Sequence, residues 1–123
     1  MLLCFAVYRC AVSPSGDKLY ITNSSQNKVL TLAKDGSVLA TLTDPALLYP
    51  NGVHMTPAGQ VLVCGGHSHT VIQVDSEGRR KLATLTTNKD GVVNPGSVCY
   101  NTHTASIIVG LENNISILVF KVE

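Results

Sequence analysis

The segment from Pro50 to Gly78, PNGVHMTPAGQVLVCGGHSHTVIQVDSEG, carries the clearest structural pattern of this chain. It contains short apolar runs rich in Val, Ile and Leu, and Gly, Pro, Asn or Ser residues separate them. Runs of this length and composition are typical of β-strands. Pro-x-Gly and Glu-Gly supply the backbone conformations that tight connections between antiparallel strands require. The stretch therefore predicts an antiparallel sheet, and its apolar residues do not follow the period of a helix.

The same pattern occurs again on both sides of this stretch. The segments Leu39–Thr43 and Leu82–Thr86 both read LATLT, 43 residues apart (82 minus 39). The Pro-x-Gly turn at 14–16 recurs at 57–59 with the same offset, and the aliphatic run at 107–109 marks a third copy. A repeat of roughly 40–45 residues with four short strands indicates a blade of a β-propeller.

We predict an all-β fold, a partial β-propeller of about three four-stranded blades, with the last blade incomplete. The chain is expected to form a single domain over 1–123, with blades at about 9–43, 52–86 and 97–121. Stacked blades share a core, because one such sheet cannot bury both of its faces alone. The expected strands lie near 3–12, 18–23, 28–33, 37–43, 52–56, 60–64, 70–75, 80–86, 97–100, 105–111 and 115–121.

Three blades leave the ring open, because propellers usually close with about four to eight blades. Three explanations follow from this. The chain is a fragment of a longer propeller, which we favour, or it associates with copies of itself to complete the ring, or a partner completes it.

Composition excludes several classes of protein. Apolar residues make up 45% of the chain and charged residues 14%, with a formal net charge of +1. This balance argues against disorder and against electrostatic capture of nucleic acid or anionic lipid. No apolar run approaches the roughly 18 residues of a membrane span. The opening run MLLCFAVYR has no basic residue before its apolar residues, so we expect a strand in a cytoplasmic protein.

The four cysteines lie in or beside apolar runs, and no two of them form a Cys-x-x-Cys pair. Free cysteine behaves as a small apolar side chain, so we expect reduced core thiols and no disulfide framework. The residues are Cys4, Cys10, Cys64 and Cys99.

The sequence contains no recognisable catalytic constellation. A Gly-x-Ser-x-Gly motif, a phosphate-binding loop and paired carboxylates at useful spacing are all missing from it. We therefore expect no catalytic residue, no cofactor and no enzymatic activity in this chain.

The repeat unit resembles the NHL repeat, which has a Pro/Gly start, an aliphatic strand, a polar loop and a second aliphatic strand. The earlier copy VSPSGDKLYITNSSQNKVLTLAKDGSVL, at 12–39, fits the same pattern. The resemblance is divergent and partial, because no Asp follows the second strand of any copy. Propellers of this kind are found in tripartite-motif ubiquitin ligases, where they bind protein or RNA. The resemblance implies a non-catalytic interaction module, with any ligase role in a longer parent chain.

The unit also resembles the gluconolactonase-type lactonase propellers, which carry Pro-Asn-Gly before an aliphatic strand. The resemblance implies that Asn51 would help to hold a divalent metal in the central channel. The carboxylate expected after the following strand is replaced by Val63-Cys64-Gly65-Gly66. A hard cation prefers several oxygen ligands, and one expected carboxylate is missing here. A metal-dependent hydrolase is therefore the alternative function, and the interaction module is the favoured one.

The candidate binding residues lie in loops expected at one face of the propeller. Long loops on a rigid scaffold commonly carry binding, and we expect a protein partner, with RNA as the alternative. His67 and His69 beside Cys64 could bind a metal, but a polar hairpin loop is the favoured interpretation. The four tyrosines could stack on bases, but packing at blade edges is the favoured interpretation for Tyr8, Tyr20, Tyr49 and Tyr100. The predicted site consists of Asn27, Lys28, Asn51, His67, His69, Asn94 and Asn113.

Overall fold

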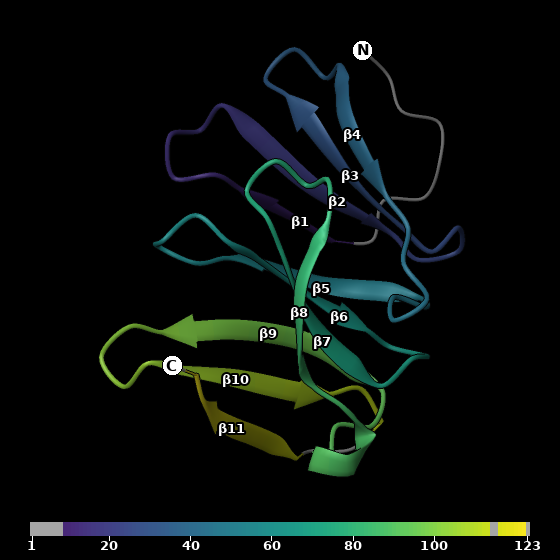
Figure 1. Cartoon of the computed structure of the whole chain (residues 1–123), viewed down its shortest axis with the longest axis vertical. Coiled ribbons are helices and arrows are strands. Elements are labelled where there is room, and N and C mark those ends of the chain that lie inside the picture. Colours follow the sequence, from purple (N-terminus) through teal and green to yellow (C-terminus); the bar gives the residue numbers. More distant parts are fainter. Residues whose placement is uncertain (1–8, 114–115, 123) are drawn as a thin grey trace.

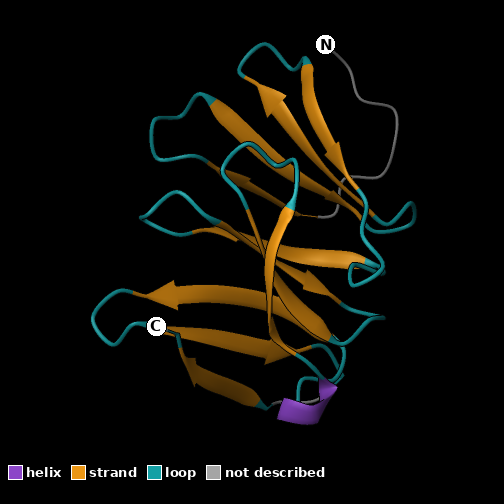
Figure 2. Ribbon diagram, viewed as in Figure 1, coloured by secondary structure: helices purple, strands orange, loops and turns teal. Residues whose placement is uncertain are grey.

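The computed structural model describes residues 9–113 and 116–122, which form three antiparallel sheets stacked side by side (Figures 1 and 2). The first sheet contains β1 (Arg9–Val12), β2 (Lys18–Asn23), β3 (Lys28–Ala33) and β4 (Val38–Leu42), in that order. The second contains β5 (Pro50–Met55), β6 (Val61–Gly65), β7 (Thr70–Val74) and β8 (Lys81–Thr86). The third contains β9 (Pro95–Asn101), β10 (Ser106–Leu111) and β11 (Ile117–Lys121).

These sheets confirm the predicted all-β architecture with three blades and an incomplete third. Each predicted strand is present within a few residues, and the part of the first strand predicted at 3–8 lies outside the described residues. A short 3₁₀-helix, η1 (Asn88–Asp90), interrupts the connection between the second and third sheets. No helix in the described part of the chain is long and apolar enough to cross a membrane.

Blades 1 and 2 bury a shared apolar core. Along β2 and β3 alternate side chains point toward blade 2, and these include Tyr20 and Val29. They meet Val61, Val63 and Ile72 of blade 2, and all five side chains are at most 1% exposed. The Tyr20 hydroxyl also donates a 2.6 Å hydrogen bond to the carbonyl of Ser76. A period of two along each strand therefore supplies one face to each neighbouring blade.

Blades 2 and 3 repeat this arrangement with the other face of blade 2. Leu62, Cys64 and Val71 point away from blade 1 and pack against Ile107 and Val109. We call the side of a blade that faces the preceding blade its front face, and the side that faces the following blade its rear face. The chain thus forms the same rear-to-front interface twice.

The rear face of blade 3 is open in the described structure. Register places Cys99, Ile108, Ile117 and Val119 together on it. Cys99 is exposed, and so is Cys10 on the front face of blade 1. The prediction of four core thiols is therefore wrong for Cys10 and Cys99, because both lie on faces that point away from blade 2. Cys64 is buried as predicted, and Cys4 lies outside the described residues.

The first strands of the blades lie next to one another at the inner side of the stack (Figure 1). Gly52 of β5 sits so close to β9 that a Cβ on it would lie 2.6 Å from the carbonyl oxygen of Gly96. The Asn-Gly sequence at this position therefore meets a packing requirement between inner strands in addition to its turn propensity.

Candidate functional site

The predicted loop face exists as one end of the stack. The β2–β3 and β6–β7 turns and the two blade-to-blade connections lie at the same ends of their sheets (Figure 1). We call this end the loop face. It contains the connection at 43–49, which joins blades 1 and 2, and the connection at 87–94, which joins blades 2 and 3.

Asn27 and His69 hold these two connections in place. The Asn27 side-chain oxygen Oδ1 accepts a 2.7 Å hydrogen bond from the backbone N–H of Tyr49. In the next blade, His69 Nδ1 accepts a 2.9 Å hydrogen bond from the backbone N–H of Asn94. All four residues have left-handed backbones, with φ between 52° and 57°. Two predicted binding residues therefore serve as equivalent structural ties between blades.

A stacked aromatic pair lies exposed on the loop face. The rings of Tyr49 and His67 lie 4.3 Å apart, with an angle of 14° between their planes. Tyr49 is 38% exposed and its neighbour Leu48 is 41% exposed. A depression of about 370 Å³, lined in part by Gln26, Asp44 and Leu48, adjoins them.

The backbone beneath this pair is held firmly. The Leu48 N–H donates to Ser68 Oγ at 3.0 Å, and the Leu48 carbonyl accepts from the His67 N–H at 3.0 Å. The Tyr49 carbonyl accepts from the Gly66 N–H at 3.0 Å. Hydrogen bonds from the β6–β7 turn therefore hold the backbone that carries the exposed side chains of Leu48 and Tyr49.

The remaining predicted site residues occupy different environments. Asn51 lies in β5 and is buried, and its side-chain oxygen accepts a 2.7 Å hydrogen bond from the N–H of Gly52. Lys28 begins β3 and is half-buried, and Asn113 is exposed beyond β10. Asn51 and Asn94 nevertheless come close together, because a Cβ on Gly66 would lie 2.9 Å from Asn51 Nδ2 and 3.3 Å from Asn94 Oδ1.

The residues weighed as metal ligands do not form a metal centre. Burial, reinforced by the negative charge of Glu112, raises the pKa of the Cys64 thiol to about 12. The Cys64 side chain packs in the core between blades 2 and 3, whereas His67 lies exposed in the β6–β7 turn. His67 stacks on Tyr49 and His69 accepts the Asn94 hydrogen bond. In the described part of the chain, no group of three His, Cys, Asp or Glu side chains could hold a metal ion.

A small pocket of about 140 Å³ lies between β1 and blade 3. Arg9 and Glu112 line it together with Ser97 and backbone of Gly96 and Gly110. Among the described residues that line this pocket, Glu112 is the only one with a carboxylate, so they do not assemble the several oxygen ligands that a hard cation prefers.

The roles of Leu48 and Tyr49 differ from what the sequence predicts. The sequence predicts that the Tyr49 ring stacks on bases or packs at a blade edge, and it predicts no role for Leu48. One signal was available, because Leu47-Leu48-Tyr49 is an apolar run inside an otherwise polar connection. Leu47 fills the core between blades 1 and 2, and the next two residues then point outward.

Comparisons with known proteins support the architecture. No protein-family model and no curated protein sequence matches the chain. The fold is similar to part of the hydrazine synthase of Kuenenia stuttgartiensis, with a TM-score of 0.77, 18% identity and coverage of 98% of this chain. It is also similar to virginiamycin B lyase from Staphylococcus aureus (TM-score 0.62, 16% identity, 94% coverage) and to a luciferin-regenerating enzyme (0.66, 16%, 89%).

These three structures are β-propeller proteins, so the chain has the fold of a partial β-propeller. It spans 36% of the length of the matched hydrazine synthase chain, 41% of the lyase and 40% of the luciferin-regenerating enzyme. Sequence identities below 20% show a shared fold and do not show a shared function, which depends on the residues of the site.

Proposed function

We propose that this chain is a non-catalytic module that binds a partner protein through the loop face. The observation that carries the proposal is the exposed Tyr49–His67 stack beside Leu48, on a backbone held by the β6–β7 turn. Tyrosine is enriched among the residues that dominate protein interfaces, and a rigid aromatic side chain loses little conformational entropy on binding. The depression lined by Gln26 and Asp44 gives polar groups to the rim of this patch.

A protein partner fits this surface better than RNA does. Binding to nucleic acid phosphates requires clustered basic side chains. The depression beside the stack is lined by Asp44, which is paired with Lys81 at 3.4 Å, and the whole chain carries a net charge of only +1. We further propose that the chain is part of a longer protein, because it spans about two-fifths of the propellers it resembles. The repeat pattern of the sequence favours an NHL-type parent protein, and the opening run of the sequence favours a cytoplasmic one.

The test compares protein capture by the wild type with capture by Tyr49→Asn and His67→Ala. Asparagine tolerates the left-handed backbone of Tyr49, so Tyr49→Asn removes the ring and leaves the connection intact. The matched control is Leu82→Ala, which truncates a 42% exposed side chain on β8. Each captured protein is then purified and titrated directly against all four forms. We expect wild type and Leu82→Ala to bind alike, and both patch variants to bind at least about tenfold more weakly.

Equal binding by the patch variants and the control would reject the loop-face patch. The alternative, a metal-dependent lactonase-type hydrolase, predicts a thermal shift with Ca²⁺ that Asn51→Ala abolishes, together with turnover of a lactone substrate. Observation of both would replace the binding module by that enzyme.

A further inference from the structure

The depression on the loop face carries hydrogen-bond donors on one wall and an acceptor on the other. Gln26 and Asn27 of the β2–β3 turn line the first wall. Asp44 lines the second wall, which belongs to the connection at 43–49. Leu48 of the same connection also lines the depression and directly precedes Tyr49 in the chain. A ligand in the depression therefore lies next to the aromatic stack.

The side chain of Gln26 keeps a free amide donor. Asn23 Oδ1 accepts hydrogen bonds of 3.2 Å from the Ser25 hydroxyl and from the Gln26 backbone N–H. The other end of the Asn23 carboxamide is therefore Nδ2, which donates to Gln26 Oε1 at 3.3 Å. This bond uses the oxygen of Gln26, so its Nε2 remains a donor, and no described residue accepts a hydrogen bond from it.

Asn27 offers a second amide donor on the same wall. The Tyr49 backbone N–H can only donate, so the Asn27 atom that lies 2.7 Å from it is the oxygen Oδ1. The Nδ2 of this carboxamide therefore remains a donor, and the described residues supply no acceptor for it. Gln26 and Asn27 are both exposed, so their NH₂ groups are available to a ligand.

Asp44 supplies the acceptor on the opposite wall. Its Oδ1 accepts a 2.9 Å hydrogen bond from the backbone N–H of Ala46 and lies 3.4 Å from Lys81 Nζ. Its Oδ2 accepts no hydrogen bond from a described residue. The Asp44 side chain is 20% exposed, and the Lys81 ammonium offsets its negative charge. Asp44 therefore adds an acceptor to the depression with little net charge.

A primary carboxamide is the side-chain group that matches this pattern. Its oxygen accepts from Gln26 and Asn27, and its NH₂ group donates to Asp44. A carboxylate has no donor and would meet the charge of Asp44, whereas an ammonium or guanidinium group has no acceptor for the two amides. Glutamine fits better than asparagine, because it has two methylene groups to lie on the exposed side chains of Pro45 and Leu48.

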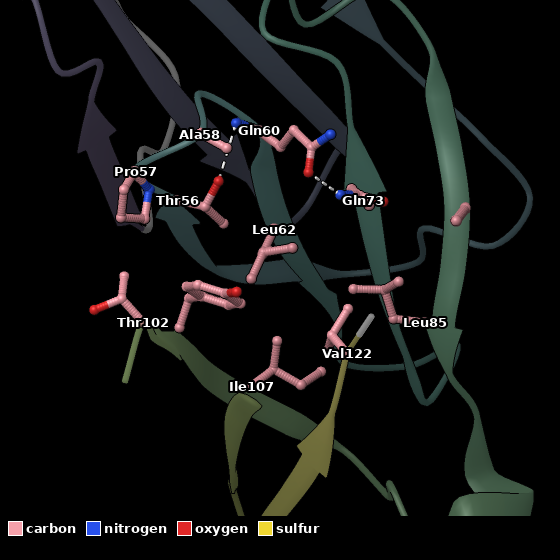
Figure 3. Close-up of a pocket in the computed structure, with 12 residues that line it drawn as sticks. Thr56, Pro57, Ala58, Gln60, Leu62, Gln73, Leu85, Thr102, Ile107 and Val122 are labelled. Carbon is pink, nitrogen blue, oxygen red and sulfur yellow. Dashed lines mark hydrogen bonds between the residues drawn. The ribbon is translucent and has the colours of Figure 1, made fainter. Parts of the chain in front are cut away.

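The chain itself contains the kind of contact that such a side chain would make. In a cavity of about 480 Å³ between blades 2 and 3, lined in part by the β5–β6 turn, Gln73 Nε2 donates to Gln60 Oε1 (Figure 3). Those two carboxamides come from this chain and bind each other. On the loop face the NH₂ groups of Gln26 and Asn27 have no such partner among the described residues.

We propose that the depression is a subsite for a glutamine side chain of the partner protein. The glutamine carboxamide binds between the two amide groups and Asp44, while neighbouring residues of the partner contact the Tyr49–His67 stack. This inference rests on the proposed function, since it specifies what the loop face recognises. A side chain that lacks a carboxamide leaves donors or acceptors of the subsite unpaired, and this cost gives the discrimination.

The first experiment selects ligands for the wild-type chain from a phage-displayed library of short random peptides. Peptides that bind Tyr49→Asn at least about tenfold more weakly identify the loop face. We expect these peptides to share a Gln. Synthetic forms with Gln→Glu or Gln→Leu at this position should bind at least about tenfold more weakly, measured by titration of fluorescent peptides.

The variant Asp44→Asn provides the sharper test. Its side chain keeps an oxygen for the Ala46 N–H and replaces the free acceptor with an NH₂ donor. Lys81 also loses its carboxylate partner. We therefore expect this variant to reverse the preference, so that the Glu-containing peptide binds more tightly than the Gln-containing one. A purely structural role of Asp44 would weaken the binding of both peptides alike.

The matched control is Asp35→Asn. Asp35 Oδ1 accepts a 2.9 Å hydrogen bond from the backbone N–H two residues later, as Asp44 Oδ1 does, but Asp35 lies in the turn between β3 and β4. We expect this control to prefer the Gln-containing peptide as the wild type does. Circular dichroism checks that each variant is folded.

The outcomes separate this subsite from the proposed function. Tyr49-dependent peptides that lack Gln or bind equally well with Glu would overturn the subsite and leave the loop-face module in place. The same holds if a folded Asp44→Asn variant keeps the wild-type preference. Gln-dependent peptides that bind Tyr49→Asn as tightly as the wild type would support the subsite and reject the aromatic patch. A selection without any peptide sensitive to either variant would overturn both.

Discussion

His69 Nδ1 accepts a hydrogen bond from the backbone N–H of Asn94 in the connection between blades 2 and 3. The nitrogen must be unprotonated to accept this bond, so the ring proton of neutral His69 lies on Nε2. One blade earlier, Asn27 makes the same bond to Tyr49 with a side-chain carbonyl. Imidazole and carboxamide therefore perform the same structural task at equivalent positions.

This equivalence predicts a difference between two substitutions of His69. We expect His69→Asn to leave the free energy of unfolding almost unchanged, because Asn accepts the same bond and tolerates the left-handed backbone. His69→Ala should lower it by about 1–2 kcal/mol, since the Asn94 N–H loses its partner. Chemical denaturation measures both values. Equal losses for the two variants would contradict this assignment.

The contact between the inner strands predicts a high cost for adding a single methyl group. In Gly52→Ala the new Cβ would lie 2.6 Å from the carbonyl oxygen of Gly96 and 2.8 Å from the Cα of Ser97. Because both neighbours are backbone atoms, the sheets must move apart, and we expect a loss of about 2–3 kcal/mol. Gly16→Ala is the control, since it has a φ of +79° and open space around it.

The Gly16→Ala substitution should cost only about 1 kcal/mol, from backbone strain alone. Thermal or chemical unfolding of the two variants compares these values. A cost for Gly52→Ala no larger than that for Gly16→Ala would show that the inner strands are not closely packed.

The cysteines should differ sharply in reactivity. Cys10 and Cys99 are exposed, whereas Cys64 is buried with a pKa raised to about 12. At pH 8, roughly one Cys64 thiol in 10⁴ is ionised, so iodoacetamide should label Cys10 and Cys99 long before Cys64. Mass spectrometry of digested peptides over a time course measures each rate. Labelling of the unfolded chain is the control, and it should modify all of these cysteines.

His54 should make the fold less stable in mild acid. Its side chain is half-buried in β5, and burial lowers its pKa below the ordinary value of 6.5. The unfolded chain therefore binds a proton at a higher pH than the folded chain does. The contribution of His54 to the free energy of unfolding is complete above pH 6.5 and decreases as the pH falls toward the lowered pKa.

His54→Gln carries no titrating group, so its free energy of unfolding should fall less than that of the wild type between pH 7 and 5. Urea denaturation at several pH values measures this difference. Parallel pH profiles for the two proteins would exclude His54 as a source of acid sensitivity.

The strands, the repeat and the incomplete third blade could all be predicted from the order of residues. The LATLT segment and the Pro-x-Gly turns recur at a fixed offset, because each blade must satisfy the same turn geometry and the same alternation of buried faces. These requirements are local or periodic, so they are visible in the order of residues along the chain.

The contacts of the loop residues depend on the three-dimensional arrangement of the blades. Asn27 and His69 lie 22 and 25 residues along the chain from the N–H groups that they bind. No local sequence pattern therefore predicts that these two side chains tie neighbouring blades together. Tyr49 meets His67 because the β6–β7 turn folds back onto the connection before β5. The difference between a core and an exposed cysteine likewise depended on whether a neighbouring blade covers that face, as it does for Cys64 and not for Cys99.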